Sequence, residues 1–419
     1  MTPTEQLAIA FEQRSQGKLA EAASLACSLL ETTEWYRAIE LAAVSLLESR
    51  SYPELATILQ VATARGYGAP LLFSRVLDSC LRSDQFDLIE EVAGRTPREN
   101  PLHAIGVYYV GCIRVVRRDA GAALAVFEYF RSIVANYLPH VPFGNDPNLN
   151  VLYRQGILVA APAEVQRRLA VAPELPPALA DFAMIDRARP ERTLICACAD
   201  ARYAERFARD LLASVAPEDG LHLHVVDPVP ATTSLLQELT ASAGPGRFGA
   251  STSRDLHYGT ATAYACARFF VLPLLLREYR RPIVTVDIDV RLSDRFPELG
   301  RVPIEFDFGC FESGRREPSS VYQAGVMIAP PTQPCIDFLS ALGDFCLFGL
   351  KLSLSASWLL DQAALYSIKH YFAVTRPEFH FQIMNGPAGG GALDFIALVT
   401  SDEEKFEMRN AVGAMPRAK

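Results

Sequence analysis

The sequence contains no block of basic residues. Its 40 Lys and Arg are outnumbered by 48 Asp and Glu, which gives a formal net charge of −8 at pH 7. Because a nucleic-acid-binding surface depends on clustered positive charge, we expect no nucleic-acid partner. Residues 1–12 also lack the basic start of a secretory signal, so no such signal is predicted there.

Long apolar runs and patterned cysteines are absent as well. The most apolar window, 269–276, is short and lies between Arg268 and Arg277, whereas a membrane-spanning helix needs about 20 apolar residues. The nine cysteines form no CxxC motif and no Cys/His cluster, which is typical of reduced thiols. We therefore expect a cytoplasmic protein without a transmembrane segment.

The first part of the chain contains a repeat. Similar polar turns begin near residues 16, 50, 83 and 118, and the apolar positions that follow them, spaced by 34, 33 and 35 residues, are Ala22, Ala56, Ile89 and Leu124. A period near 34 with two helices per unit resembles the tetratricopeptide repeat. The 419 residues are enough for two or three domains, and we assign 1–135 to an all-α domain of this kind. A generic α-helical bundle is the alternative.

Residues 136–190 differ in composition because prolines interrupt them. The eight prolines of this segment exclude a long helix, although short helices are predicted at 149–158 and 163–169. Apolar residues such as Tyr153 and Phe182 indicate that the segment packs against its neighbours. We therefore predict a packed connector rather than a free linker.

Residues 191–419 alternate between strand and helix patterns. Strands are predicted at 193–199, 221–226 and 283–286, helices at 202–215, 233–241 and 262–278, and a Gly- and Ser-rich loop at 244–253. This order predicts an α/β sandwich with a mostly parallel sheet.

Two carboxylates follow the third predicted strand. Asp287 and Asp289 come directly after the β-branched run 283–286, on one face of an extended chain, with Cα atoms about 6.6 Å apart. Two like charges this close call for a proton or a metal ion between them. Ligands also bind at the carboxyl ends of strands in open α/β sheets. We therefore predict a metal-carrying active site, with a solvated turn as the alternative.

Further motifs follow in the order found in one family of enzymes. They are Asp200 and Tyr203, Arg268 within the segment 264–273, Gln323-Ala324-Gly325-Val326, and Asp361-Gln362. Together with Asp287 and Asp289 they resemble the GT-A glycosyltransferases, most closely the retaining type related to glycogenin and the lipopolysaccharide galactosyltransferases. The resemblance covers about residues 191–400. It implies that 191–419 form a GT-A domain, a Rossmann-like α/β/α sandwich, that takes a sugar from a nucleotide-sugar donor such as a UDP-sugar.

The resemblance also implies roles for the donor-side residues. Asp287 and Asp289 would hold Mn²⁺ or Mg²⁺, which neutralises the diphosphate as its bond to the sugar breaks. Arg268 would bind phosphate or sugar hydroxyls through its forked donors. Asp200 and Tyr203 would hold the uracil and ribose, with an N-cap and a packing aromatic as the alternative.

Other residues are placed near the acceptor or the metal by the same resemblance. Ala324 and Gly325 would allow close approach to the donor sugar, and Asp361 and Gln362 would face the reacting sugar and the acceptor. The family's third metal ligand is a His near the C-terminus, followed by a Gly-x-x-Lys-Pro-Trp run. His380 is the similar position here, but no Lys-Pro-Trp follows it, and a plain strand also fits 379–387.

Two other functions fit parts of the sequence. A phosphatase of the haloacid dehalogenase type also places Asp-x-Asp after a strand, but Arg291 stands where that motif has Thr or Val. A non-catalytic scaffold with a degenerate transferase domain is the second alternative. For a transferase, we expect the helical repeats to recruit the acceptor, a protein or a glycan. Self-association of the repeats is the competing interpretation.

Overall fold

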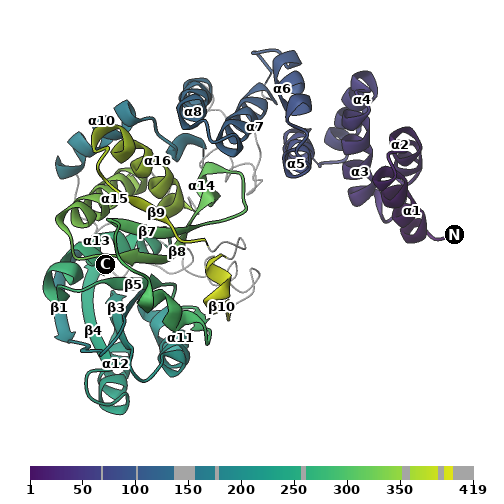
Figure 1. Ribbon diagram of the computed structural model, residues 1–419. Coiled ribbons are helices and arrows are strands. Elements are labelled where there is room, and N and C mark those ends of the chain that lie inside the picture. The colour runs from purple at the N-terminus through teal and green to yellow at the C-terminus, as the bar shows by residue number, and fades with distance from the viewer. Residues whose placement is uncertain are drawn as a thin grey trace. The chain divides into compact units, whose positions relative to one another are not determined.

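The computed structural model describes residues 1–67, 69–100, 102–135, 156–174, 179–255, 261–351, 359–385 and 391–399. The chain divides into two compact units, Met1–Ile157 and Leu158–Lys419, which are drawn in Figure 1. The division falls inside the predicted connector 136–190, whose part from Leu158 onward belongs to the second unit. Most of the helix predicted at 149–158 lies outside the described residues.

The first unit is all-α over its described residues. Its helices form consecutive pairs, namely α1 (Pro3–Ser15) with α2 (Leu19–Ser28), α3 (Trp35–Glu48) with α4 (Tyr52–Ala64), α5 (Ala69–Arg82) with α6 (Phe86–Arg95), and α7 (Leu102–Val116) with α8 (Ala120–Ala135). A capping box between Thr2 and Glu5 begins the first helix. Short turns join the two helices of each pair, so each pair buries its apolar faces locally.

The same kind of turn joins the two helices of each of these pairs. Gly17, Arg50, Asp84 and Arg118 have φ values of 77°, 57°, 59° and 56°, and they are spaced by 33, 34 and 34 residues. The amide after each of these residues donates to the carbonyl five positions earlier, as from Lys18 to Gln13 at 2.9 Å, which is the Schellman hydrogen bond. The period near 34 is therefore a property of the fold, whereas membership of the tetratricopeptide family stays a prediction.

Gly substitutions in these turns are expected to stabilise the first unit. A side chain at φ near +57° costs about 1 kcal/mol relative to Gly, while the exposed Arg50–Glu91 ion pair contributes less than that. Arg50→Gly should therefore raise the free energy of unfolding by about 0.5 kcal/mol, as measured by urea denaturation. Gly17→Ala should lower it by about 1 kcal/mol. A loss of stability in Arg50→Gly would show that the turn is not strained.

The second unit is an α/β fold around an eight-stranded sheet in the order β1-β4-β3-β2-β5-β8-β7-β9. The strands are β1 (Leu179–Asp186), β2 (Leu194–Asp200), β3 (Gly220–Val226), β4 (Phe248–Asp255), β5 (Ile283–Val286), β7 (Phe308–Glu312), β8 (Tyr322–Ala329) and β9 (Phe381–Ile383). The neighbours β4, β3, β2 and β5 run parallel, which confirms the predicted α/β class with a mostly parallel sheet. Strand β6 (Val290–Leu292) pairs separately with β10 (Ile396–Leu398).

Three strands of this sheet, β1, β4 and β7, were not predicted. Residues 244–253 were expected to form a loop, but β4 occupies most of them, and β1 lies in the predicted connector. A Cβ on Gly249 would lie 2.3 Å from the amide nitrogen of Ala188, so small residues here let the chain at 186–188 pass close to the strand. The Gly and Ser content thus reflects tertiary packing rather than a loop.

Helices cover both faces of the sheet (Figure 1). On one face, α11 (Ala201–Ser214) and α12 (Pro230–Ser242) pack on β2, β3 and β4. The other helices are α10 (Pro162–Val171), α13 (Ala261–Tyr279), α14 (Pro318–Val321), α15 (Gln333–Lys351) and α16 (Leu360–Thr375), with short 3₁₀ turns at Ala172–Glu174, Phe296–Arg301 and Ala392–Asp394. Alternate residues of β2, such as Ile195 and Ala197, pack with Phe207 of α11 in the core, while α13 covers the opposite face.

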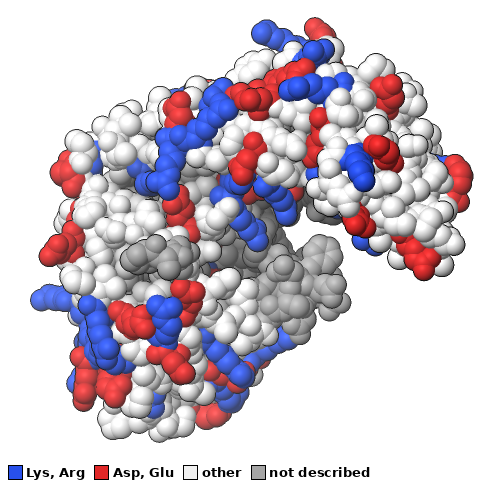
Figure 2. Space-filling view, turned by 45° about the vertical axis from the view of Figure 1, so that its right-hand side comes forward, with Lys and Arg blue, Asp and Glu red and all other residues white. Residues whose placement is uncertain are grey.

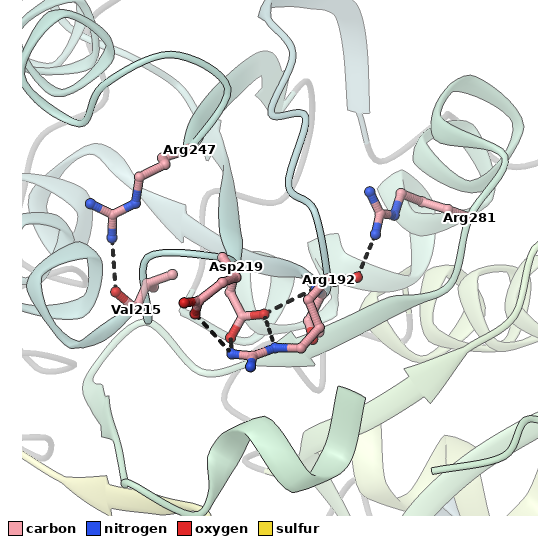
Figure 3. A network of polar contacts seen from close by, with 7 residues as sticks. Arg192, Val215, Asp219, Arg247 and Arg281 are labelled. Carbon is pink, nitrogen blue, oxygen red and sulfur yellow. Dashed lines mark hydrogen bonds and ion pairs between the residues drawn. The ribbon is translucent and has the colours of Figure 1, made fainter. Parts of the chain in front are cut away.

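A buried ion pair ties together the loops at the amino ends of the strands (Figure 3). Arg192 donates from Nε and Nη2 to the carboxylate of Asp219 at 2.8 and 2.7 Å, and Asp219 is 1% exposed. Arg281 donates to the carbonyls of Pro190, at 2.6 Å, and Arg192. These contacts join the segments that precede β2, β3 and β5. The polar side chains at the amino edge of these strands therefore bind one another and hold the loops in place.

The surface carries mixed charge. On the face in Figure 2, the described Lys and Arg side chains lie among Asp and Glu side chains rather than in one continuous basic area. None of the described helices is both long and apolar enough to cross a lipid bilayer.

Candidate active site

Four aspartates line the carboxyl edge of the parallel strands. They follow or end β4, β3, β2 and β5 in the spatial order of the sheet, and they are Asp255, Asp227, Asp200 and Asp287. Parallel neighbours end at the same edge, which is where open α/β sheets bind ligands. The sequence prediction used only Asp200 and Asp287. The signal for the other two is the same, because each carboxylate closes a strand.

Asp200 has a structural role at this edge. Its Oδ1 accepts a hydrogen bond of 2.8 Å from the amide of Tyr203, which makes it the N-cap of α11. The side chain is 9% exposed, and burial raises the pKa of this carboxyl group. Tyr203 packs against Phe207 with ring centroids 5.5 Å apart. The N-cap and the packing aromatic are thus both present, and contact of either residue with a nucleotide stays a proposal.

Tyr264 lies beside the same row of carboxylates. Its hydroxyl donates to Oδ2 of Asp227 at 3.3 Å, and the amide of Asp255 donates to Oδ1 of Asp227 at 2.9 Å. Burial, together with the charges of Asp227, Asp255 and Asp200, raises the pKa of Tyr264. The hydroxyl therefore stays protonated at neutral pH and available as a donor.

Arg268 lies one helical turn after Tyr264 on α13 and is 9% exposed. Its Nη2 donates to Oδ1 of Asp287 at 2.7 Å, its Nη1 to the carbonyl of Ala324 at 2.6 Å, and its Nε to the carbonyl of Ala265 at 3.0 Å. Burial opposes its charge, but the carboxylates of Asp287 and Asp361 raise the pKa of Arg268 above its ordinary value. The guanidinium is a fixed positive charge at the end of β5.

Asp287 directly follows β5 and faces β8. Its amide donates to the carbonyl of Gly325 at 3.1 Å, and its side chain is 33% exposed. A Cβ on Gly325 would lie 2.8 Å from Oδ2 of Asp287. Gly325 therefore leaves the space that this carboxylate occupies. The predicted close approach of a donor sugar to Ala324 and Gly325 stays a prediction.

Asp361 and Gln362 begin α16 next to this group. Burial raises the pKa of Asp361, against the opposing effect of the Arg268 charge. With its amide oriented to suit its neighbours, Gln362 donates to the carbonyls of Tyr322 and Ser319 at 3.0 and 3.1 Å. The structure thus brings together Arg268, Asp287, Ala324, Gly325 and Asp361, while Gln362 ties α16 to the start of β8.

Asp289 and His380 occupy different settings. Asp289 lies in the turn between β5 and β6, is 6% exposed, and accepts a hydrogen bond at its carbonyl from Val399 at 3.1 Å. His380 is exposed and bonds through Nδ1 to the carbonyl of Glu305 at 2.9 Å. The sequence predicted Asp287 and Asp289 on one face of an extended chain, but Ile288 and Asp289 form a turn after β5, so the strand does not continue through them. A metal ion shared by the two carboxylates stays a prediction.

The structure does not bring His380 to this pair. The register from β9 through β7 and β8 to β5 places Gln382 level with Val284. His380 then lies roughly 16 Å back along the strands from Asp287 and about 14 Å across the sheet. A cation bound at Asp287 has its ligands within about 2.6 Å, so His380 cannot share it. The reason is that His380 lies just before β9, at the end of the sheet opposite to the one at which β5 ends on Asp287.

The described residues contain no group of three His, Cys, Asp or Glu side chains arranged to hold a metal ion. The donor set nevertheless suits a hard cation in part. The Asp287 side chain is 33% exposed, and carboxylate oxygens are ligands that Mn²⁺ and Mg²⁺ accept. A cation here would need further oxygens, and the phosphates of a nucleotide can supply them.

Gly325→Ala is expected to weaken nucleotide binding without unfolding the chain. The new Cβ displaces the Asp287 carboxylate, which lies 2.8 Å away, so the affinity for UDP with Mn²⁺ should fall at least about tenfold. Isothermal titration calorimetry measures this. Gly314→Ala is the matched control, because a Cβ there meets nothing within 4 Å. Equal affinity in Gly325→Ala and the wild type would show that this space is not used.

The chain matches no protein-family model and no curated protein sequence. Parts of it are similar to solved glycosyltransferases. The apo WbbM bifunctional glycosyltransferase is 14% identical, with a TM-score of 0.30, over 48% of this chain and 39% of that one. Mouse xyloside xylosyltransferase 1 is 14% identical, with a TM-score of 0.30, over 46% of this chain and 85% of that one. GlyE of Streptococcus pneumoniae is 13% identical, with a TM-score of 0.34, over 54% and 61%.

This chain therefore spans less than two thirds of the length of WbbM and of GlyE. At these identities and TM-scores we take no function from the neighbours. The functional proposal below starts from the residues at the carboxyl edge of the sheet.

Proposed function

We propose that the second unit is a metal-dependent glycosyltransferase that moves a sugar from a nucleoside diphosphate donor, in the first instance a UDP-sugar, to an acceptor. One observation carries the proposal. A buried guanidinium, Arg268, is paired with Asp287 at the carboxyl edge of a parallel sheet, beside Asp361 and beside Gly325, whose lack of a side chain makes room for the Asp287 carboxylate. The ordered motifs of the GT-A glycosyltransferases fall on these same residues.

The chemistry of sugar transfer fits these groups. Breaking the bond between sugar and diphosphate leaves negative charge on a phosphate oxygen, which a cation and a guanidinium both stabilise. Asp287 and Asp289 would hold Mn²⁺ or Mg²⁺, and the cation would supply that Lewis-acid charge. Arg268 has forked donors suited to phosphate or to sugar hydroxyls.

The remaining residues would position the two substrates. Ala324 and Gly325 would lie beside the donor sugar, next to Asp287. Asp361, at the start of α16, would face the reacting carbon and the acceptor, with Gln362 positioning the helix start. Asp200 and Tyr203 would hold the base and ribose. Retention of configuration is implied by the resemblance to the glycogenin type and by that resemblance alone.

We further propose that the first unit recruits the acceptor, a protein or a glycan. The first helices of three successive pairs, α1, α3 and α5, line a groove of about 170 Å³ that includes Phe11, Arg37 and Arg75. Phe11 is 41% exposed, and a guanidinium beside an exposed ring suits both peptides and sugars. Phe11→Ser should reduce transfer to the acceptor while leaving donor hydrolysis unchanged. Equal transfer in this variant would favour self-association as the role of the helices.

A panel of nucleotide-sugars tests the proposed activity. The full chain is incubated with UDP-, GDP- and dTDP-sugars and Mn²⁺, and released nucleotide is measured. We expect slow hydrolysis of one donor class, because activated donors react with water when no acceptor is present. Release of phosphate from p-nitrophenyl phosphate instead would support the phosphatase alternative. Failure to hydrolyse or bind any nucleotide would favour the non-catalytic scaffold.

A further inference from the structure

The three donor nitrogens of Arg268 are all engaged within the protein. Nη2 is committed to Asp287, Nη1 to the carbonyl of Ala324 on β8, and Nε to the carbonyl of Ala265 one turn earlier in α13. The side chain is 9% exposed. The guanidinium is therefore held in one position by two elements of the fold, and Asp287 cannot be moved away from it at low cost.

This pairing bears on how a cation reaches Asp287. Oδ1 of Asp287 already accepts a hydrogen bond from Arg268 at 2.7 Å, so Oδ2, which lies next to Gly325, is the oxygen that a cation would use. The Asp287 side chain is 33% exposed, so solvent reaches it. A divalent cation on that oxygen would lie within a few ångströms of the guanidinium, and two positive charges at about 5 Å repel strongly enough to cost about tenfold or more in affinity. A cation arriving alone meets a carboxylate whose charge is already balanced.

A nucleoside diphosphate changes this balance. Its phosphate oxygens can accept hydrogen bonds from the remaining guanidinium hydrogens and can also ligate the cation. The negative charge of the diphosphate then separates the two positive charges. The cation and the nucleotide therefore bind favourably together although the cation alone is opposed, which is a coupling between two ligands of one site.

We propose that Arg268 lowers the affinity of Asp287 for a divalent cation alone and thereby makes cation binding depend on the nucleotide. The proposal rests on the proposed function, because it takes a nucleoside diphosphate as the second ligand. It assigns Arg268 two opposite effects, since the same charge repels the cation and attracts the diphosphate. A residue that served folding alone would have neither effect.

Substitution of Arg268 separates these effects. In Arg268→Gln the full chain should bind Mn²⁺ alone about tenfold more tightly than the wild type, as measured by loss of the free-Mn²⁺ electron paramagnetic resonance signal. The affinity for UDP with Mn²⁺ should fall at least tenfold, as measured by calorimetry. Arg268→Lys keeps the charge and should bind Mn²⁺ alone as the wild type does. Arg209→Gln removes an arginine from an exposed ion pair with Glu238 and should change neither affinity.

The wild-type chain provides a test that does not depend on any variant folding. Its affinity for Mn²⁺ should rise at least tenfold when UDP is saturating. If wild-type Mn²⁺ binding is independent of UDP, or if folded Arg268→Gln binds Mn²⁺ no more tightly than the wild type, the proposed effect of Arg268 on cation binding is wrong while the proposed function stands. A wild-type chain that binds no nucleotide under any condition overturns the proposed function, and with it the proposed effect of Arg268 on cation binding.

Discussion

Asp287→Asn is expected to reduce donor hydrolysis by about 10²–10³-fold. The substitution keeps the size of the side chain but removes the charge that would hold the cation, and loss of one group that stabilises developing charge costs this much in other enzymes. It also leaves Arg268 buried without its carboxylate, so the free energy of unfolding should fall by a few kcal/mol. Hydrolysis must therefore be measured well below the melting temperature of the variant.

Asp210→Asn is the matched control for this change. Asp210 also pairs with an arginine, Arg291, at 3.1 Å, but both side chains are more than half exposed. Such a pair contributes little to stability, and Asp210 lies outside the proposed site. Its variant should keep full activity. An Asp287→Asn variant that is folded and as active as Asp210→Asn would remove Asp287 from the mechanism.

The second large effect concerns two buried histidines and the stability of the second unit. His222 is hydrogen-bonded through Nδ1 to the hydroxyl of Tyr279 and through Nε2 to Ser251, both at 2.8 Å. His224 is hydrogen-bonded to Ser251 and Ser253, both at 2.9 Å. Both histidines are 0% exposed. Their hydrogen-bond partners are hydroxyl groups, so no carboxylate among those partners offsets a positive charge on either ring.

Acidification should therefore destabilise this unit. Burial lowers the pKa of His222 and of His224 from 6.5 to about 3, and for His222 the neighbouring His224 adds to the effect. The unfolded chain, with histidine pKa values near 6.5, binds more protons than the folded chain between about pH 6.5 and pH 3, so stability falls as pH falls through this window. Between pH 7 and pH 5 each histidine should remove about 2 kcal/mol from the free energy of unfolding.

Urea unfolding at pH 7.5, 6 and 5 measures this loss, with the double variant His222→Gln/His224→Gln for comparison. The variant should be less stable at pH 7.5 but should lose about 4 kcal/mol less than the wild type on going to pH 5. Buried carboxyl groups with raised pKa values, such as Asp200 and Asp361, act in the opposite direction equally in both proteins. If the two proteins lose the same stability, the histidines are not the cause.

The sequence predicted which edge of the sheet carries Asp200 and Asp287 because the signal for these residues is local. An apolar β-branched run that ends on Asp287, and an apolar run at 194–199 that ends on Asp200, place carboxylates at the carboxyl ends of neighbouring strands. The repeat of the first unit was visible for the same reason, since each turn falls about 34 residues after the last. These features depend on residues close together in the chain.

Other features depend on contacts that the sequence does not contain. In strand β4, Gly249 lets the chain at Ala188 pass close, and the hydroxyls of Ser251 and Ser253 bond the buried His222 and His224. His380 is the position similar to the third metal ligand of the GT-A family, but the parallel pairing of β9 with β7 places it at the other end of the sheet from Asp287. The ion pair of Arg268 with Asp287 was not predicted either, and it means that removing the Arg268 side chain affects stability as well as binding.

The central claim is that the carboxyl edge of the sheet binds a nucleoside diphosphate together with a divalent cation through Asp287 and Asp289. Calorimetric titration of UDP into the full chain with Mn²⁺ present, repeated with the Asp287→Ala/Asp289→Ala variant, tests it most directly. We predict saturable binding by the wild type and at least a hundredfold weaker binding by the double variant, with both proteins folded by circular dichroism. Equal binding of UDP and Mn²⁺ by the two proteins would contradict the claim.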